Sequence, residues 1–220
     1  MRNTLLLALS LASLVQTVTA NPLVGGLADV DKTWERCLIC VSPESATVSC
    51  AVGYVGKAGL ERGFQVHLPL IVPETMNGDE QRVLKTFKPR LEFDGRILEG
   101  KSVSFHAFPS VPGVSFARCT FDFPRAPGKS FSIVASYEQP VINGHIYYVP
   151  QFESGKSPGS SGEYTISFFP TGSATLSLKS THKNNATALG TRITVHPVHE
   201  ELIVVSVASG SGAKPAAGQE

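Results

Sequence analysis

The stretch that decides the fold is WERCLICVSPESATVSCAVGYV, residues 34–55. Two runs of alternating apolar and polar residues, 34–41 and 46–55, flank a turn at residues 42–45. This alternation is typical of strands with one buried face, and a four-residue loop pairs Val41 with Ala46. The shared face is then apolar throughout: Cys37, Ile39, Val41, Ala46, Val48, Cys50, Val52 and Tyr54. The stretch therefore predicts a β-hairpin with Cys37 opposite Cys50.

The same two-residue period continues along the chain. It recurs at 64–70, 102–107, 131–138, 164–168, 176–179 and 192–195. About eleven short strands separated by turn residues predict an all-β fold, namely an antiparallel β-sandwich, with a closed β-barrel as the alternative. Helix is scarce, and one short helix is expected within residues 77–87, capped by Asn77.

Three turn sequences predict further hairpins. Asp94-Gly95 and Asn143-Gly144 suit two-residue turns, and Pro170-Thr171-Gly172 suits a three-residue loop with glycine at the left-handed position. The expected pairs are Arg90 with Glu99, Val141 with Ile146, Tyr137 with Pro150, Phe168 with Ala174, Ile166 with Leu176, and Tyr164 with Leu178.

The N-terminus has the order of a secretory signal. Arg2 precedes a short apolar run, and small residues follow at positions 17–20 before Asn21. The run is too short to span a bilayer, which takes about twenty apolar residues. We expect residues 1–20 to be removed and the protein to be secreted or periplasmic, with no transmembrane segment after signal removal.

The rest of the chain suits one domain. Residues 21–32 are expected to be an N-terminal linker, 33–208 a single β-sandwich domain, and 209–220 a disordered tail rich in Gly, Ser, Ala and Pro. The polar segment 153–162 is interpreted as a long loop, because the four strands after it are too few to fold alone.

The charge balance excludes some classes of partner. The chain has 19 Lys and Arg against 18 Asp and Glu, and removal of Arg2 makes the two equal. Charged residues are only 17% of the sequence, whereas the usual share is roughly 25%. A neutral chain of this kind does not suit a polybasic nucleic-acid binder, so no nucleic acid is expected as a partner.

Four cysteines remain after signal removal: Cys37, Cys40, Cys50 and Cys119. An even count in an exported chain favours disulfides, and the predicted register favours Cys37–Cys50. Cys37 and Cys40 have the CxxC spacing, but a strand puts residues three apart on opposite faces, so a thioredoxin-like role is disfavoured. A zinc site from the cysteines is an alternative, although only one close pair exists.

Other candidate chemistry is sparse. His196 and His199 form a weak metal-ligand pair, next to Glu200 and Glu201. Asn185 begins an Asn-Ala-Thr glycosylation sequon, which matters only in a eukaryotic host. No nucleophile elbow, zinc-protease motif or phosphate loop occurs, and no cofactor is expected.

The sequence thus favours an exported, non-catalytic binding or structural module of the cell envelope or extracellular space. Its partner would be a protein or a glycan. Two alternatives stay open: a secreted hydrolase whose site assembles from distant strands, and a metal or redox accessory protein that uses the cysteines or histidines.

Overall fold

The computed structural model describes residues 23–24, 30–56, 64–106, 111–123, 130–150, 163–179, 186–197 and 202–210. The predicted signal at 1–20 and all but the first two residues of the predicted tail lie outside this part. The elements up to the helix are β1 (Leu23–Val24), β2 (Val30–Val41), β3 (Ser45–Gly56), β4 (Phe64–Pro73), a 3-10 turn (Glu74–Met76) and α1 (Glu80–Phe87). The next six are β5 (Arg90–Phe93), β6 (Arg96–Glu99), β7 (Ser102–His106), β8 (Val114–Phe123), β9 (Ser130–Pro140) and β10 (His145–Tyr148). The last are β11 (Glu163–Pro170), β12 (Ala174–Leu178), β13 (Ala186–Leu189), β14 (Arg192–Val195) and β15 (Ile203–Ser209).

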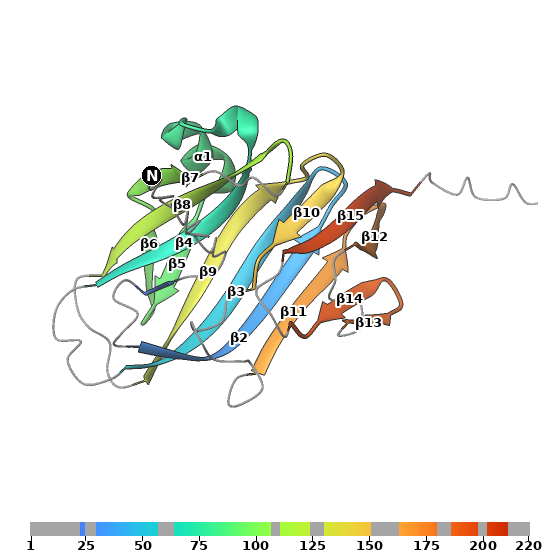
Figure 1. Cartoon of the computed structure of the whole chain (residues 1–220). Helices are drawn as coiled ribbons and strands as arrows, with labels where there is room; N and C mark the ends of the chain where they lie inside the picture. The colour runs from blue at the N-terminus through green and yellow to red at the C-terminus, as the bar shows by residue number, and fades with distance from the viewer. Residues whose placement is uncertain are drawn as a thin grey trace, which may run out of the picture.

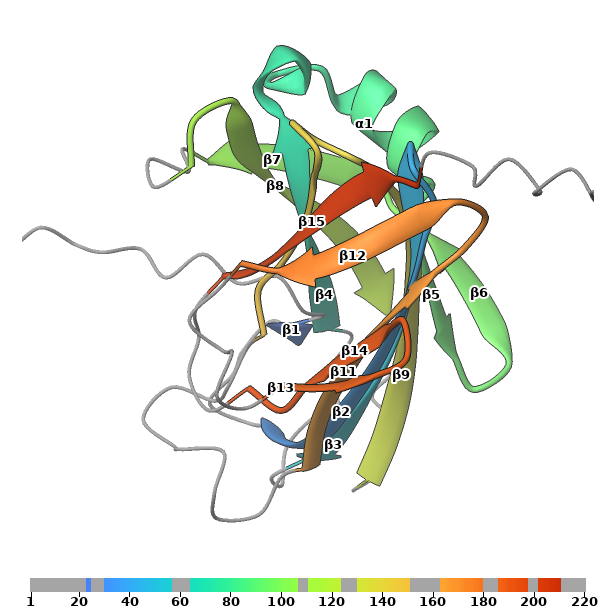
Figure 2. The ribbon, with the colours of Figure 1, turned by 90° about the vertical axis from the view of Figure 1, so that its right-hand side faces the viewer.

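The strands form three open sheets that pack as a sandwich (Figures 1 and 2). The largest sheet has eight strands in the order β13-β14-β11-β2-β3-β9-β5-β6. A four-stranded sheet, β1-β4-β8-β7, and a three-stranded sheet, β10-β15-β12, contribute the facing layer. One apolar core lies between the layers and takes side chains from all three sheets and from α1. The predicted all-β sandwich is therefore confirmed, and the closed barrel is not formed.

The hairpin at the centre of the large sheet has the predicted register. β2 and β3 pair Val41 with Ala46, Ile39 with Val48, and Cys37 with Cys50. All eight residues of the predicted apolar face are buried. Loop length and alternation specify the same register here, so the two signals reinforce each other. β2 begins at Val30 and β1 at Leu23, both inside the segment 21–32 for which a linker was expected.

The other turns are correct as turns, but two of the three predicted hairpins are wrong. Asp94 and Gly95 both have positive φ, and β5 and β6 pair Arg90 with Glu99 as expected. Asn143 and Gly144 also form a tight turn, but β10 leaves β9 after one bridge and pairs with β15. Because a turn only reverses the chain, it does not decide which strand becomes the neighbour.

The hairpin expected across residues 170–172 does not form. β11 pairs with β14 and, in parallel, with β2, whereas β12 pairs with β15 in the opposite layer. Ile166 and Phe168 are buried, and Leu176 and Leu178 pack against the same core from the other side. The chain crosses between layers at Thr171–Gly172, so both strands still bury the apolar face that the pattern predicts. Alternation indicates the buried face and not the partner strand.

The one α-helix lies where the sequence placed it. Its cap is Asp79 rather than Asn77, since the Asp79 carboxylate accepts from the backbone N–H of Arg82 at 3.0 Å. Val83 and Phe87, four residues apart, bury the apolar face of the helix in the core. Among the described residues, no helix is long and apolar enough to span a membrane.

Candidate functional site

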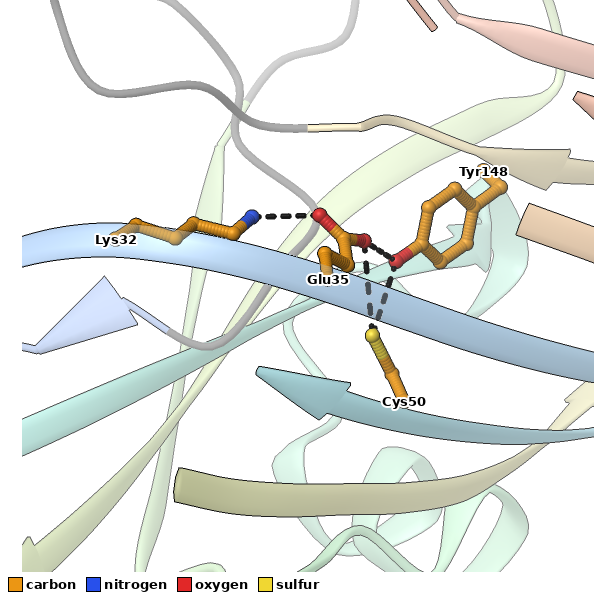
Figure 3. A network of polar contacts seen from close by, with 4 residues as sticks. All are labelled: Lys32, Glu35, Cys50 and Tyr148. Carbon is orange, nitrogen blue, oxygen red and sulfur yellow. Dashed lines mark hydrogen bonds and ion pairs between the residues drawn. The ribbon is translucent and has the colours of Figure 1, made fainter. Parts of the chain in front are cut away.

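A cluster of polar side chains lies inside the sandwich (Figure 3). The Glu35 cluster consists of Lys32 and Glu35 on β2, Cys50 on β3 and Tyr148 on β10. Glu35 is fully buried, and its Oε2 lies 2.6 Å from Nζ of Lys32. The Tyr148 hydroxyl donates to Oε1 of Glu35, and the Cys50 thiol lies 3.6 Å from the same oxygen. The cluster therefore ties the large sheet to the three-stranded sheet.

A β-bulge brings Lys32 into this cluster. In a regular strand, residues three apart point to opposite faces, so Lys32 and Glu35 would not meet. The pairing of β2 with β3 shifts register between Lys32 and Trp34, so β2 has one more residue than β3 at this point. The extra residue turns the side chain of Lys32 to the same face as that of Glu35. The Lys32 ammonium group also lies 5.1 Å from the centre of the Tyr164 ring. The bulge thus provides a cation for a carboxylate that the strand pattern buries.

Burial keeps the neutral members of the cluster protonated. Loss of solvent raises the pKa of the Cys50 thiol well above its usual value, and contact with Cys37 raises it further. Loss of solvent, followed by the nearby Cys37 thiol, likewise raises the pKa of Tyr148. Both groups therefore act as donors toward Glu35. A nucleophilic cysteine needs a lowered pKa, so this arrangement suits a structural role.

The sequence contains one signal for this cluster, namely a carboxylate on the apolar face of β2. Glu35 continues the period-two face of Cys37, Ile39 and Val41, and the structure pairs it with Val52. A carboxylate on an apolar face needs a buried partner. Tyr148 lies 113 residues further along, so strand patterns could not identify it.

An open hollow lies between the end strands of two sheets. β12 is an edge strand of the three-stranded sheet and β13 an edge strand of the large sheet, and both are labelled in Figure 2. The residues that line the hollow come from β12 and from the β13–β14 hairpin. Its volume is about 460 Å³. The described lining residues are Thr175, Leu176, Ser177, Leu178, Ala186, Thr187, Ala188, Gly190, Thr191 and Ile193. None of these is charged or aromatic. This hollow is the candidate binding site.

The two strands beside the hollow, β12 and β13, are edge strands of the described sheets. An edge strand leaves part of its backbone N–H and C=O groups without a neighbour in the sheet. Thr175 and Ser177 are exposed on β12, and Thr187 and Ala188 are exposed on β13. Below them, Leu176 and Leu178 pack half-buried against the core. Among the described residues, the hollow therefore has an apolar floor, hydroxyl-bearing walls and two strand edges without a neighbouring strand.

The structure places the cysteines as the strand pattern requires. Cys37 and Cys50 are opposite and buried, and Cys40 pairs with Thr47 on the outer face of the same hairpin. Cys119 lies on β8 in another sheet, where loss of solvent raises the pKa of its thiol to about 12. All four are free thiols in this structure, so the Cys37–Cys50 disulfide stays a prediction.

The remaining predicted site residues fall mostly outside the described part. His196 follows β14, and its Nδ1 lies 3.3 Å from the backbone oxygen of Tyr164. His199, Glu200, Glu201 and the sequon residue Asn185 are not described. Among the described residues, no group of three or more His, Cys, Asp or Glu side chains could hold a metal ion.

Comparisons with known proteins give no family. No family model matches the sequence, and no curated protein matches it. Among solved structures, a candidate nutrient binding protein of Legionella pneumophila is similar, with 8% identity, a TM-score of 0.49, and 86% of this chain and 72% of that chain covered.

Two further solved structures are also similar to this chain. The M1 zinc metallopeptidase of Deinococcus radiodurans has 11% identity, a TM-score of 0.34, and 81% of this chain and 42% of that chain covered. Yeast LTA4 hydrolase in complex with bestatin has 9% identity, a TM-score of 0.41, and 88% and 31% covered. The chain thus spans less than half the length of these two proteins. At such scores and identities, the likenesses define neither a family nor a function.

Proposed function

We propose that this protein is an exported, non-catalytic binding module that holds its ligand in the hollow between β12 and the β13–β14 hairpin. The observation that carries the proposal is a hollow of about 460 Å³ lined by uncharged side chains between two open strand edges. Ligand sites usually enclose about 300–1,000 Å³ and are mostly apolar with a few polar groups. Export rests on the signal-like segment at residues 1–20.

The ligand that best fits this hollow is an extended, uncharged stretch of another polypeptide. An extended peptide can add a strand to a free sheet edge, with main-chain hydrogen bonds providing affinity and alternate side chains entering pockets. β12 supplies such an edge, and Leu176 and Leu178 supply an apolar floor. A glycan fits less well, because sugar rings commonly stack on aromatic side chains and the described lining contains none.

The Glu35 cluster is not the binding site in this proposal. Its carboxylate is fully buried, and its cation, hydroxyl and thiol contacts come from within the chain. Such a network stabilises one arrangement of the two layers when its members are satisfied. A ligand would have to open the sandwich to reach it.

The experiment compares two variants in a selection from a displayed library of linear twelve-residue peptides. Ala188→Trp fills the hollow from an exposed position, and Ser49→Trp places the same ring on the outer face of β3 as the matched control. We expect wild-type protein to enrich peptides that still bind Ser49→Trp and no longer bind Ala188→Trp. A glycan array is probed in parallel. Enriched peptides that bind both variants equally, or binding to glycans alone, would overturn the proposal.

A further inference from the structure

The outer face of the four-stranded sheet gathers cationic and hydroxyl side chains around Arg118. Arg118 on β8 pairs with Pro69 on β4 and with Ser104 on β7. In the next row, Thr120 pairs with His67 on β4. These strands thus bring Arg118, His67, Thr120, Ser104 and the nearby His106 together. We name this group the Arg118 face.

Strand alternation aims Arg118 away from the core. Its neighbours in sequence, Ala117 and Cys119, are fully buried in the core, so the side chain between them points to the other face of the sheet. Arg118 is nevertheless half-buried, and its Nε atom is shut off from solvent. In the described part of the chain, this N–H has no hydrogen-bond acceptor. A buried donor on a charged group is costly to leave unpaired, and so the position calls for an acceptor.

The acidic group on this face already has partners. Asp122, two residues along β8, accepts from Nζ of Lys101 at 2.8 Å and from the Gln65 amide at 2.9 Å. The hydrogen bond from Lys101, and then the one from Gln65, lower the pKa of Asp122. The carboxylate is therefore ionised at neutral pH and faces Lys101.

The remaining neighbours are neutral or cationic. His67 Nδ1 lies 3.2 Å from the Thr120 hydroxyl, and His106 Nε2 lies 3.3 Å from the Ser104 hydroxyl. Phe116, whose ring lies 5.9 Å from that of His106, belongs to a second apolar cluster that also contains Tyr147 of β10. β1, the other neighbour of β4, has no titratable side chain. In the described part, the face thus offers donors without an anion to receive them.

We propose that the Arg118 face binds an oxyanion, either a carboxylate or a tetrahedral sulfate- or phosphate-type group, against the guanidinium of Arg118. Two oxygens of such a group can accept from two N–H donors of a single guanidinium in parallel. Ser104 lies directly across from Arg118 on β7, and Thr120 lies two residues further along β8. Their hydroxyl groups can donate to a further oxygen of the anion. The site lies on another sheet from the hollow and is independent of the function proposed above.

The histidines make this binding depend on pH. Partial burial, and then the positive charge of Arg118, lower the pKa of both His67 and His106. A bound anion offsets the arginine charge, so it raises both pKa values. By linkage, the anion binds more tightly as the pH falls and the histidines become protonated.

The test titrates the mature protein with sodium sulfate and, separately, sodium acetate at constant ionic strength. Sulfate keeps its charge between about pH 5.5 and 7.5, so any change in affinity comes from the protein. We expect one of the two anions to bind, at least about threefold tighter at the lower pH, with tighter sulfate indicating a tetrahedral ligand and tighter acetate a carboxylate. Arg118→Gln should weaken binding by about tenfold or more, whereas Arg96→Gln, an exposed arginine on β6, should not.

A second readout does not depend on the anion. In Arg118→Gln, NMR titration should give higher pKa values for His67 and His106, since the arginine charge is gone. If that variant fails to fold, Arg118→Lys keeps the charge but removes the paired N–H donors, and it should still lose most of the affinity. Equal binding by wild-type protein and these variants, or no binding of either anion at either pH, would overturn the proposal.

Discussion

The Glu35 cluster and the hollow are two places in the described part of this sandwich where the side chains differ from a plain apolar core. The first contains an ion pair, a hydroxyl and a thiol, and it is sealed between the layers. The second has no charged residue in its described lining, and it is open at the ends of two sheets. The richer chemistry is thus in the less accessible place.

This difference separates stability from binding. A buried ion pair whose members are satisfied by the protein itself leaves nothing for a ligand to complete. An uncharged hollow bordered by free strand edges still has backbone groups and apolar area to offer. We therefore expect changes in the Glu35 cluster to affect folding and changes in the hollow to affect binding. The predictions below test that division.

The largest expected effect is on thiol reactivity. At about pH 8 iodoacetamide should alkylate the half-exposed Cys40 readily, whereas Cys50 should react at least about a thousandfold more slowly, through opening of the fold. The raised pKa of Cys50 keeps its thiolate scarce at this pH, and the thiolate grows only as the pH rises. Mass spectrometry of timed digests measures both rates. Equal rates would mean that Cys50 is not sealed in the interior. A peptide in the non-reduced digest that links Cys37 to Cys50 would reveal that disulfide instead.

Glu35→Gln should cost about 3–5 kcal/mol in the free energy of unfolding, because it removes the negative charge of a buried ion pair while the Lys32 ammonium group stays buried. Glu138→Gln is the matched control. Its partner is Lys88, and both side chains are about half exposed, so the loss should stay below about 1 kcal/mol. Urea denaturation measures both. Similar losses in the two variants would mean that the buried pair is no more important than the surface pair.

Tyr148→Phe should cost about 1.5–3 kcal/mol, the usual loss for a hydrogen bond to a charged group. The adjacent Tyr147→Phe serves as the control, since the Tyr147 hydroxyl makes no hydrogen bond with the described residues, and we expect a change within about 0.5 kcal/mol. The same denaturation curves decide the outcome. A larger loss of unfolding free energy in Tyr147→Phe than in Tyr148→Phe would mean that the hydrogen bond in the Glu35 cluster is not the stabilising contact.

Ala188→Trp should change the free energy of unfolding least, by about 0.5 kcal/mol or less, because the added ring enters open space at an exposed position. Thermal unfolding beside Ser49→Trp gives the comparison. A marked loss in Ala188→Trp alone would mean that the hollow is part of the packed core and not a site kept open for a ligand.

Agreement between turn length and alternation was enough to predict the pairing of the central hairpin, but not that of the hairpin expected across residues 170–172. In β2 and β3, loop length and alternation both require Cys37 opposite Cys50, and that pairing is found. In β11 and β12, the pattern predicts the buried faces correctly, but the choice of partner depends on competition with β2, β14 and β15. Partner choice among many similar strands is a property of the whole sandwich and not of a local segment.

The candidate site was less accessible to sequence reasoning. The hollow exists because β12 and β13 end their sheets, which follows from strand order. Glu35 carried a readable signal on its apolar strand face, yet its contact with Lys32 required a bulge that no local turn sequence marks. A binding site of this kind depends on the order of the strands in the sheets, which involves residues far apart in the sequence. The sequence alone predicted only which face of each strand is buried.

The most direct test of this division measures one peptide against two variants. A peptide enriched by the wild-type protein is titrated into Glu35→Gln and Ala188→Trp by calorimetry, at a temperature where circular dichroism shows both to be folded. We expect Glu35→Gln, although much less stable, to bind with wild-type affinity, and the fully stable Ala188→Trp to lose binding. Lost binding in folded Glu35→Gln together with unchanged binding in Ala188→Trp would contradict it.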